Sequence, residues 1–326
     1  MKKAFAAAAA LAAMLCLIFA PAAAVEQSRY ALALCAELIV PSLLPFFAAS
    51  ALLIRLRIPQ LLARPLAPAA KRLWGVSGAG AAVFLAGLCG GYPLGAQTAA
   101  EMYRMGQLSK EEAERLLGFC NNSGPSFLIG VIGTGLFASR AAGLLLYAIH
   151  ALAALLTGVI LRGRGIGETP LPPPEESDSF AATLVASVHQ AVGSVLAVCG
   201  FIVCFCVFSG MLDSFGLFDA AAAALASLSG FERSDLRALL IGLIELSSGI
   251  GALRGLPLTP ERFALAAALA GWGGLSVQFQ TLAVLQDTDL SARRHLAGRV
   301  LSAVLSALLA LAASTLFLLP PLANGT

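Results

Sequence analysis

The most regular feature of this sequence is a series of long apolar runs, separated by short segments that carry most of the charge. A run of about 18 apolar residues is long enough for an α-helix to cross a bilayer. The runs that meet this requirement include 4–24, 141–161, 184–211 and 300–319. A further apolar stretch, 30–56, is interrupted by Pro41 and Pro45. The pattern predicts an all-α polytopic membrane protein.

Composition strengthens this prediction. The 326 residues are 59% hydrophobic and 12% charged, with a mean hydropathy of +0.86, whereas about 25% of the residues in a soluble domain are charged. The net charge of +3 gives no indication of nucleic-acid binding. We therefore expect an integral membrane protein, with the lipid bilayer as its surroundings and no nucleic-acid partner.

The segment 87–135 is the most unusual part of the apolar pattern. Gly87, Gly91 and Gly95 recur every four residues, a spacing that lets backbones approach closely inside lipid. Further on, the polar run 121–125 (Asn-Asn-Ser-Gly-Pro) lies between apolar stretches. Broken backbone and clustered polar groups survive in a bilayer only where protein or a watery cavity satisfies them. The segment therefore predicts a re-entrant hairpin over 76–98, a helix that breaks at 121–125, and a binding site or pore.

The second half of the sequence repeats this plan, with a hairpin over 238–251 and a helix that breaks at 271–277. Three short matches occur in the same order in both halves: 88–91 with 246–249, 108–111 with 258–261, and 124–126 with 274–276. Internal repeats that contain glycine-interrupted short segments are typical of secondary transporters.

The basic residues predict how the two repeats are oriented, because lysine and arginine concentrate on the cytoplasmic side. With Lys2 and Lys3 inside, the first hairpin enters from the cytoplasm and the second from outside. The prediction is two inverted repeats, each with a re-entrant hairpin and a broken helix. Its parts are N-terminal membrane helices over 1–75, a first repeat over 76–161, a proline-rich cytoplasmic linker over 162–180, and a second repeat with a C-terminal helix over 181–326. Segment 4–24 is interpreted as an uncleaved helix, with a cleaved secretory signal as the alternative.

Glu245 is the strongest single candidate for a functional residue, because it is a carboxylate within an otherwise apolar segment. A carboxylate at membrane depth costs about 2.5–3.5 kcal/mol on insertion scales, which favours a substrate, cation or proton site. The alternative is a protonated or paired glutamate with a structural role.

The other candidate substrate-binding residues flank the predicted breaks, where half-helix N-termini favour anionic groups. They are Gly91, Tyr92, Gln97, Thr98, Asn121, Asn122, Ser123, Ser247, Ser248, Ser276 and Gln278. The alternative role for the polar ones is hydrogen bonding between helices.

Nothing in the sequence predicts an enzyme or a metal site. The seven cysteines and three histidines form no metal-ligand spacing, and no catalytic constellation is visible. We therefore expect no cofactor beyond a coupling proton or sodium ion at Glu245. A homo-oligomer stays open as an alternative to a monomer.

Three motifs resemble the YlbJ/SpoVV family of sporulation integral membrane proteins, which carry nucleoside-recognition gate domains. They are Gly-Gly-Tyr-Pro-Leu-Gly-Ala at 90–96, Glu-Arg-Leu-Leu-Gly-Phe-Cys-Asn-Asn-Ser-Gly-Pro at 114–125, and Gly-Gly-Leu-Ser-Val-Gln at 273–278. The resemblance covers about 41–305 and includes Leu-Gln-Asp-Thr-Asp-Leu at 285–290. Relatives of the gate domain include concentrative nucleoside transporters, so the resemblance implies the same inverted-repeat fold, with 76–161 and 181–326 as gate repeats.

The resemblance also implies a function, the transport of dipicolinic acid across the outer forespore membrane. Glu245 would repel this aromatic dicarboxylate unless a proton or a cation were bound there. Two rival functions stay open. One is a transporter of the same fold for nucleosides or another metabolite, and the other is a non-transporting membrane assembly factor of the spore envelope.

Overall fold

The computed structural model describes residues 11, 14–15, 17–163 and 179–317. Within these residues the chain is helical and contains no strand, which confirms the predicted all-α fold. The first third of the predicted span 4–24 with three further residues, most of the linker 162–180 and the end of the span 300–319 lie outside the described residues.

In the described part of the chain, four helical segments are long and apolar enough to cross a membrane. They are Pro21–Arg55, Arg140–Ile160, Phe180–Ser214 and Arg293–Ser314. A fifth candidate is a pair of helices, Pro65–Leu73 and Gly78–Gly90, which meet at 85°. The spans predicted near 141–161, 184–211 and 300–319 therefore correspond to helices.

The first span is one continuous run of helix in spite of its prolines. It consists of α2 (Pro21–Leu34), a π-helical turn η1 (Cys35–Ile39) and α3 (Val40–Arg55). Proline has no N–H to donate to the preceding turn, and the π-helical turn precedes both Pro41 and Pro45. Buried Phe47 and Cys35 pack this span against the long helix α9 (Phe180–Ser214).

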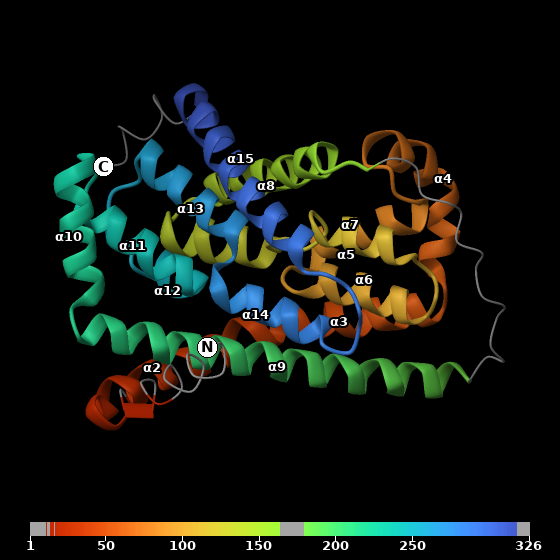
Figure 1. The fold of residues 1–326 in the computed structure, drawn as a ribbon, viewed down its shortest axis with the longest axis horizontal. Coiled ribbons are helices and arrows are strands. Elements are labelled where there is room, and N and C mark those ends of the chain that lie inside the picture. Colours follow the sequence, from red (N-terminus) through yellow and green to blue (C-terminus); the bar gives the residue numbers. More distant parts are fainter. Residues whose placement is uncertain (1–10, 12–13, 16, 164–178, 318–326) are drawn as a thin grey trace.

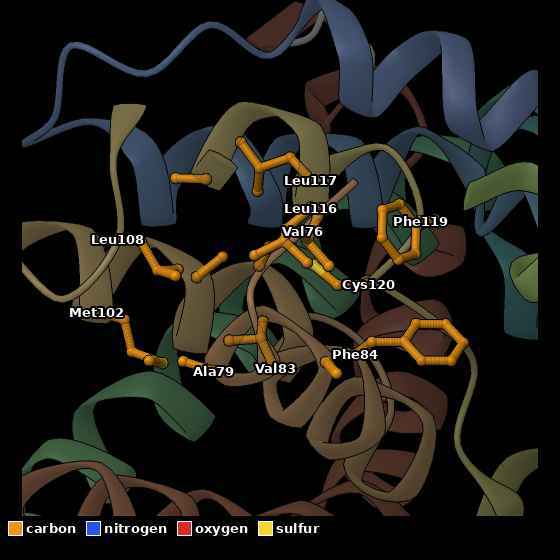
Figure 2. Packing of buried hydrophobic residues seen from close by; sticks show 14 of the residues in the cluster. Val76, Ala79, Val83, Phe84, Met102, Leu108, Leu116, Leu117, Phe119 and Cys120 are labelled. Atoms are coloured by element: carbon orange, nitrogen blue, oxygen red, sulfur yellow. The ribbon is translucent and has the colours of Figure 1, made fainter. Parts of the chain in front are cut away.

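The rest of the first half forms a hairpin, a broken helix and a span. Its elements are α4 (Ile58–Leu73), α5 (Gly78–Gly90), α6 (Leu94–Arg104), α7 (Lys110–Leu117), η2 (Ser126–Leu136) and α8 (Arg140–Ile160). Helices α5 and α6 pack on each other as the hairpin predicted over 76–98. Buried apolar side chains of α5, α6 and α7 meet in one core, shown in Figure 2. The rings of Trp74, Phe84 and Phe119 pack there with centroids 4.9 to 5.5 Å apart.

The second half has the same order of elements. These are α10 (Leu217–Ser229), α11 (Arg233–Ile244), α12 (Leu246–Gly251), α13 (Pro260–Trp272), α14 (Gly274–Leu285) and α15 (Arg293–Phe317). Helix α15 packs against α13 and also against α8 of the first half. A second apolar core includes Phe263 of α13 and Leu128 and Ile132 of η2, so it joins the two halves.

Two of the three predicted sequence matches occupy equivalent places. Ser109 caps α7 by accepting a hydrogen bond from the Glu112 N–H (3.2 Å), and Thr259 caps α13 by accepting one from the Arg262 N–H (3.3 Å). The second match, 124–126 with 274–276, lies at the starts of η2 and α14.

The match of 88–91 with 246–249 is wrong. Residues 88–90 end the first arm of their hairpin, whereas 246–249 lie in the second arm of the other. Gly95 is the counterpart of Gly249, because each closes its hairpin against a glycine of the opposite arm, Gly87 and Gly242 respectively. Spacing alone could not reveal this shift, since glycines recur in both arms.

Figure 1 shows the two hairpins toward opposite ends of α9, α5 and α6 at one end and α11 and α12 at the other. Helices α4 and α10 run across these same two ends. This arrangement is compatible with inverted repeats. The inversion itself and the predicted domain boundaries stay predictions.

Candidate functional site

Helices are interrupted at four places in the middle of the described structure. We call these the four interruptions: residues 91–93 between α5 and α6, 118–125 between α7 and η2, 245 between α11 and α12, and 273 between α13 and α14. Each separates two short helices, and broken backbone of this kind lines binding sites in transporters.

Close glycine contacts bring the four interruptions together. Gly91 (φ +85°) lies against Gly124, so that a Cβ added at Gly91 would be 3.1 Å from the Gly124 nitrogen. In the second half, a Cβ added at Gly274 would be 2.9 Å from the Leu246 nitrogen. The halves also touch each other, since a Cβ at Gly273 would be 3.4 Å from the ring of Tyr92. The tip of each hairpin therefore meets the break of its own half, and both halves meet.

A cavity of ≈ 80 Å³ lies at this meeting point. Its wall is mainly apolar, and all its polar residues except Ser42 of α3 come from the four interruptions or the helices that follow them. The lining includes Gly91, Tyr92, Ser123, Gly124, Ser126, Glu245, Ser247, Ser276 and Gln280, with α3 and α9 closing the remaining sides. An apolar pocket with a few convergent polar groups is the usual form of a small-molecule site.

Four short helices, α6, η2, α12 and α14, begin at this cavity. The N-terminus of a helix carries unpaired N–H groups and partial positive charge. Of these four helices only α12 has a side-chain cap, whereas α6, η2 and α14 have none. Three helix N-termini that no side chain caps therefore face one small cavity, an arrangement that favours an anion.

Glu245 supplies the cap of α12. Its Oε1 accepts a hydrogen bond from the Ser247 N–H (3.0 Å) and its Oε2 accepts one from the Ser248 N–H (2.6 Å). The Cys206 thiol donates to the same Oε2 at 3.5 Å. Glu245 is 1% exposed and forms no ion pair within the described residues. Glu245 therefore has a structural role, and the same residue lines the cavity.

A hydrogen bond joins the interruption before η2 to α8. The Ser123 N–H donates to Nε2 of His150 at 3.0 Å, so this ring nitrogen accepts and the imidazole proton is assigned to Nδ1. Nδ1 is buried and has no hydrogen-bond partner within the described structure. This contact fixes the backbone of Ser123, a residue that lines the cavity.

The structure brings half of the predicted site residues to the cavity. Gly91, Tyr92, Ser123, Glu245, Ser247 and Ser276 line it. They lie within three residues of a helix start, which is the position where side chain and backbone can reach a ligand together.

The other predicted residues contact protein instead. The amide of Gln97 donates to the Ser194 hydroxyl (2.9 Å), and the hydroxyl of Thr98 bonds to that of Ser50 (3.2 Å). Ser248 belongs to the cap of α12 and lines a separate hollow.

The amide side chains near the helix breaks also bond to protein. The Asn121 amide donates to the Thr281 hydroxyl (3.0 Å), and the Asn122 amide donates to the Phe119 carbonyl (2.9 Å). Gln278 donates to the Trp272 carbonyl at 2.7 Å. These contacts fit the alternative of hydrogen bonding between and within helices.

One charged residue beside the cavity was not among the predicted site residues. Arg299 of α15 is fully buried, and its Nη1 donates to the hydroxyl of Tyr92 at 2.9 Å. In the sequence it directly precedes the apolar run 300–319, where a basic residue normally marks a membrane boundary. The sequence holds no signal for it; the structure identifies it because α15 begins at Arg293 and places Arg299 inside the helix.

Two further hollows follow α9 on either side of the cavity. One, of ≈ 330 Å³, is lined by α9 residues from His189 to Phe201 and shares Val198 and Gln280 with the cavity. The other, also ≈ 330 Å³, is lined by Ser209, Asp213 and charged neighbours such as Arg254. The hollows and the cavity thus form a series along one helix. No group of three or more His, Cys, Asp or Glu side chains able to hold a metal occurs among the described residues.

Comparison with known proteins identifies a relative among sporulation proteins. The chain is 30% identical over 315 residues to the sporulation integral membrane protein YlbJ of Bacillus subtilis (strain 168), covering 88% of this chain and 76% of that protein. The chain belongs to the YlbJ family. The predicted family is thereby confirmed, and YlbJ-family membership together with the apolar helices makes this an integral membrane protein. No family model matches the chain, and no solved structure matches it.

Proposed function

We propose that this YlbJ-family protein is a secondary transporter of a small organic anion, and that its substrate is dipicolinic acid, carried across the outer forespore membrane during sporulation. The observation that carries the proposal is the cavity at which the uncapped N-termini of α6, η2 and α14 begin. Such termini offer N–H donors and positive potential to a carboxylate.

The composition of the cavity wall suits an aromatic dicarboxylate. The hydroxyls of Ser123 and Ser276 can donate to carboxylate oxygens, while Phe127 and Val277 give apolar surface for a ring. The series of hollows along α9 supports passage of a solute, because it leads from the cavity toward both ends of that helix.

The size of the cavity bears on the transport cycle. A cavity of about 150 Å³ holds benzene, and dipicolinate is a six-membered aromatic ring with two added carboxylates. The present volume of ≈ 80 Å³ is therefore too small for it. We infer that this conformation is closed and that the interruptions separate to admit substrate, which agrees with hairpins that move in an alternating-access cycle.

Glu245 is proposed as the coupling site. A dicarboxylate beside the Glu245 carboxylate would be repelled, and a proton or sodium ion bound there would remove the repulsion. We expect the Glu245→Gln variant to lose the pH or sodium dependence of uptake. Uptake that depends on pH and sodium as in the wild type would exclude Glu245 from coupling.

Flux of labelled dipicolinate into proteoliposomes, with imposed proton and sodium gradients, tests transport. The cavity variants Ser123→Ala and Ser276→Ala should each lower kcat/KM roughly tenfold, because a hydrogen bond to a charged group contributes about 1.5–3 kcal/mol. The control is Ser187→Ala, since the Ser187 hydroxyl is buried in α9 and bonds to the Thr183 carbonyl (2.7 Å), away from the cavity.

The rival functions give different results in the same assay. Flux of nucleosides without flux of dipicolinate would show that the protein is a transporter with a different substrate. No flux of either from protein that remains folded, together with a partner protein retained on purification, would support the assembly factor.

A further inference from the structure

Arg299 is a fully buried cation for which the described residues provide no acid. Its Nη1 donates to the Tyr92 hydroxyl (2.9 Å) and, more weakly, to the Gly271 carbonyl (3.4 Å). Its Nε and Nη2 are buried and have no hydrogen-bond partner in the described structure. No ion pair formed by the described residues includes it. Burying an unpaired charge is costly, so its presence in a membrane helix indicates a function.

Arg262 of the same protein shows the usual arrangement of a buried arginine. Its side chain is 9% exposed, and its Nε lies 2.8 Å from the Asp235 carboxylate. The guanidinium of Arg262 is therefore compensated within the protein, whereas that of Arg299 is not. The missing anion at Arg299 would have to come from a ligand.

Tyr92 lies between Arg299 and the cavity. The guanidinium carbon of Arg299 is 5.7 Å from the centre of the Tyr92 ring, and Tyr92 itself lines the cavity. The Tyr92 hydroxyl accepts from Arg299 and donates to the Ala270 carbonyl at 2.8 Å, which holds the ring in place. One side chain thus separates the charge from the cavity, and in surroundings of low dielectric a charge acts strongly over such a distance.

A structural role explains only part of this geometry. The carbonyls of Ala270 and Gly271 lie at the C-terminal end of α13, where a cation is favourable. That role occupies Nη1, and the two other nitrogens of the guanidinium stay without partners.

We propose that Arg299 is the fixed counter-charge of the substrate, acting from behind Tyr92, and that it makes the cavity select anions over neutral molecules of the same shape. This rests on the proposed anion-transport function and adds the residue that sets the charge preference. The charge of Arg299 is opposite to that of Glu245, a residue that lines the same cavity. The substrate carboxylate is expected nearer to Tyr92 than to Glu245.

The test is binding of two probes to the purified full chain in lipid nanodiscs, measured by calorimetry. The probes are dipicolinate and the neutral dicarboxamide of the same ring. Wild type should bind dipicolinate at least tenfold more tightly. Arg299→Gln should abolish this preference while it leaves dicarboxamide binding within about twofold, and Arg299→Lys should largely restore the preference because the charge remains.

Arg293→Gln is the matched control, because it removes the same charge from an exposed position of the same helix and should change neither affinity. Equal affinity of wild type for the two probes would overturn the proposal without any variant, even if Arg299→Gln failed to fold. An Arg299→Gln protein that binds both probes more weakly by the same factor would show a structural role instead. If wild type binds dipicolinate and Arg299→Gln binds it equally well, only this inference fails. If wild type binds neither probe, the proposed function fails with it.

Discussion

The tips of the two hairpins share a backbone plan and differ in charge. In each, a pair of glycines closes the arms, Gly87 with Gly95 in the first and Gly242 with Gly249 in the second. Each tip also touches the broken helix of its own half. The shared plan follows from close backbone packing, which only glycine permits at these positions.

The difference lies in what occupies the helix N-terminus after each tip. At the second tip, the Glu245 carboxylate accepts hydrogen bonds from the Ser247 and Ser248 N–H groups in the first turn of α12. At the first tip, α6 begins without a side-chain cap and the cation of Arg299 lies behind Tyr92. The two tips share one backbone plan, but a cation lies near the first and a carboxylate lies at the second. The first suits a substrate carboxylate, and the second suits a coupling proton or cation.

The largest effect is expected from breaking the shared glycine plan. A Cβ at Gly95 would be 2.6 Å from the Cys120 carbonyl carbon, so Gly95→Ala forces the hairpin away from the break after α7. We expect it to destabilise the fold by about 3 kcal/mol, the upper end of typical overpacking costs. Thermal unfolding in detergent measures this. Gly130→Ala is the control, because a Cβ at Gly130 meets nothing within 4 Å; equal melting of both variants would show that the contact is not tight.

The next effect comes from removing the carboxylate that distinguishes the second tip. Glu245→Ala leaves the Ser247 and Ser248 N–H groups without their acceptor, and the loss of a helix cap costs about 1–2 kcal/mol. Glu245→Gln keeps one acceptor oxygen and should therefore lose less stability than Glu245→Ala. Glu111→Ala, at an exposed acid in the first turn of α7, provides the surface control. Unfolding that is unaffected by Glu245→Ala would contradict the capping role.

A smaller effect concerns the contact between the halves. The Asn121 amide donates to Thr281 of α14, so Asn121→Ala and Thr281→Val should show a coupling of about 1 kcal/mol in a double-mutant cycle. Asn122 is the control residue, because its amide bonds locally to the Phe119 carbonyl and should show no coupling to Thr281. If Asn122 showed equally strong coupling to Thr281, the cycle would report a general loss of order in residues 118–125 and not the Asn121–Thr281 hydrogen bond.

The smallest effect is expected at the exposed pair of Lys110 and Asp289, which joins the start of α7 to the loop before α15 at 2.7 Å. Hydrogen bonds from Lys110 and Tyr103 hold the pKa of Asp289 below its usual range. Any stabilisation is therefore present at neutral pH and is lost as the pH falls through the lowered pKa. Because both side chains are exposed, Asp289→Asn should leave the melting temperature unchanged within error. A clear drop at neutral pH that disappears in acid would show that this pair contributes more than surface pairs usually do.

The sequence was sufficient for features that depend on local patterns. Hydropathy located the spans that became α8, α9 and α15, and glycine and proline located the interruptions near 91–93 and 121–125. The match of 108–111 with 258–261 was recognisable from a few neighbouring residues, and each segment contains the cap of the helix that follows, Ser109 or Thr259. These features do not depend on how the helices pack.

The parts that could not be predicted depend on helix rotation and packing. Asn121 and Ser123 are two residues apart, yet only Ser123 lines the cavity, because the irregular backbone turns Asn121 toward α14. Arg299 looks like a flanking charge until α15 is seen to begin at Arg293 and to bury it against Tyr92. Which side of a half-helix faces the cavity is decided by long-range contacts.

The most direct test of the account is a cryo-electron microscopy structure of the protein in nanodiscs with dipicolinate at a concentration that saturates uptake. The account predicts ligand density in a widened cavity bounded by the four interruptions, with a carboxylate near Tyr92 and the start of α6. Density at a place that none of the interruptions borders, or a cavity left empty under these conditions, would contradict it.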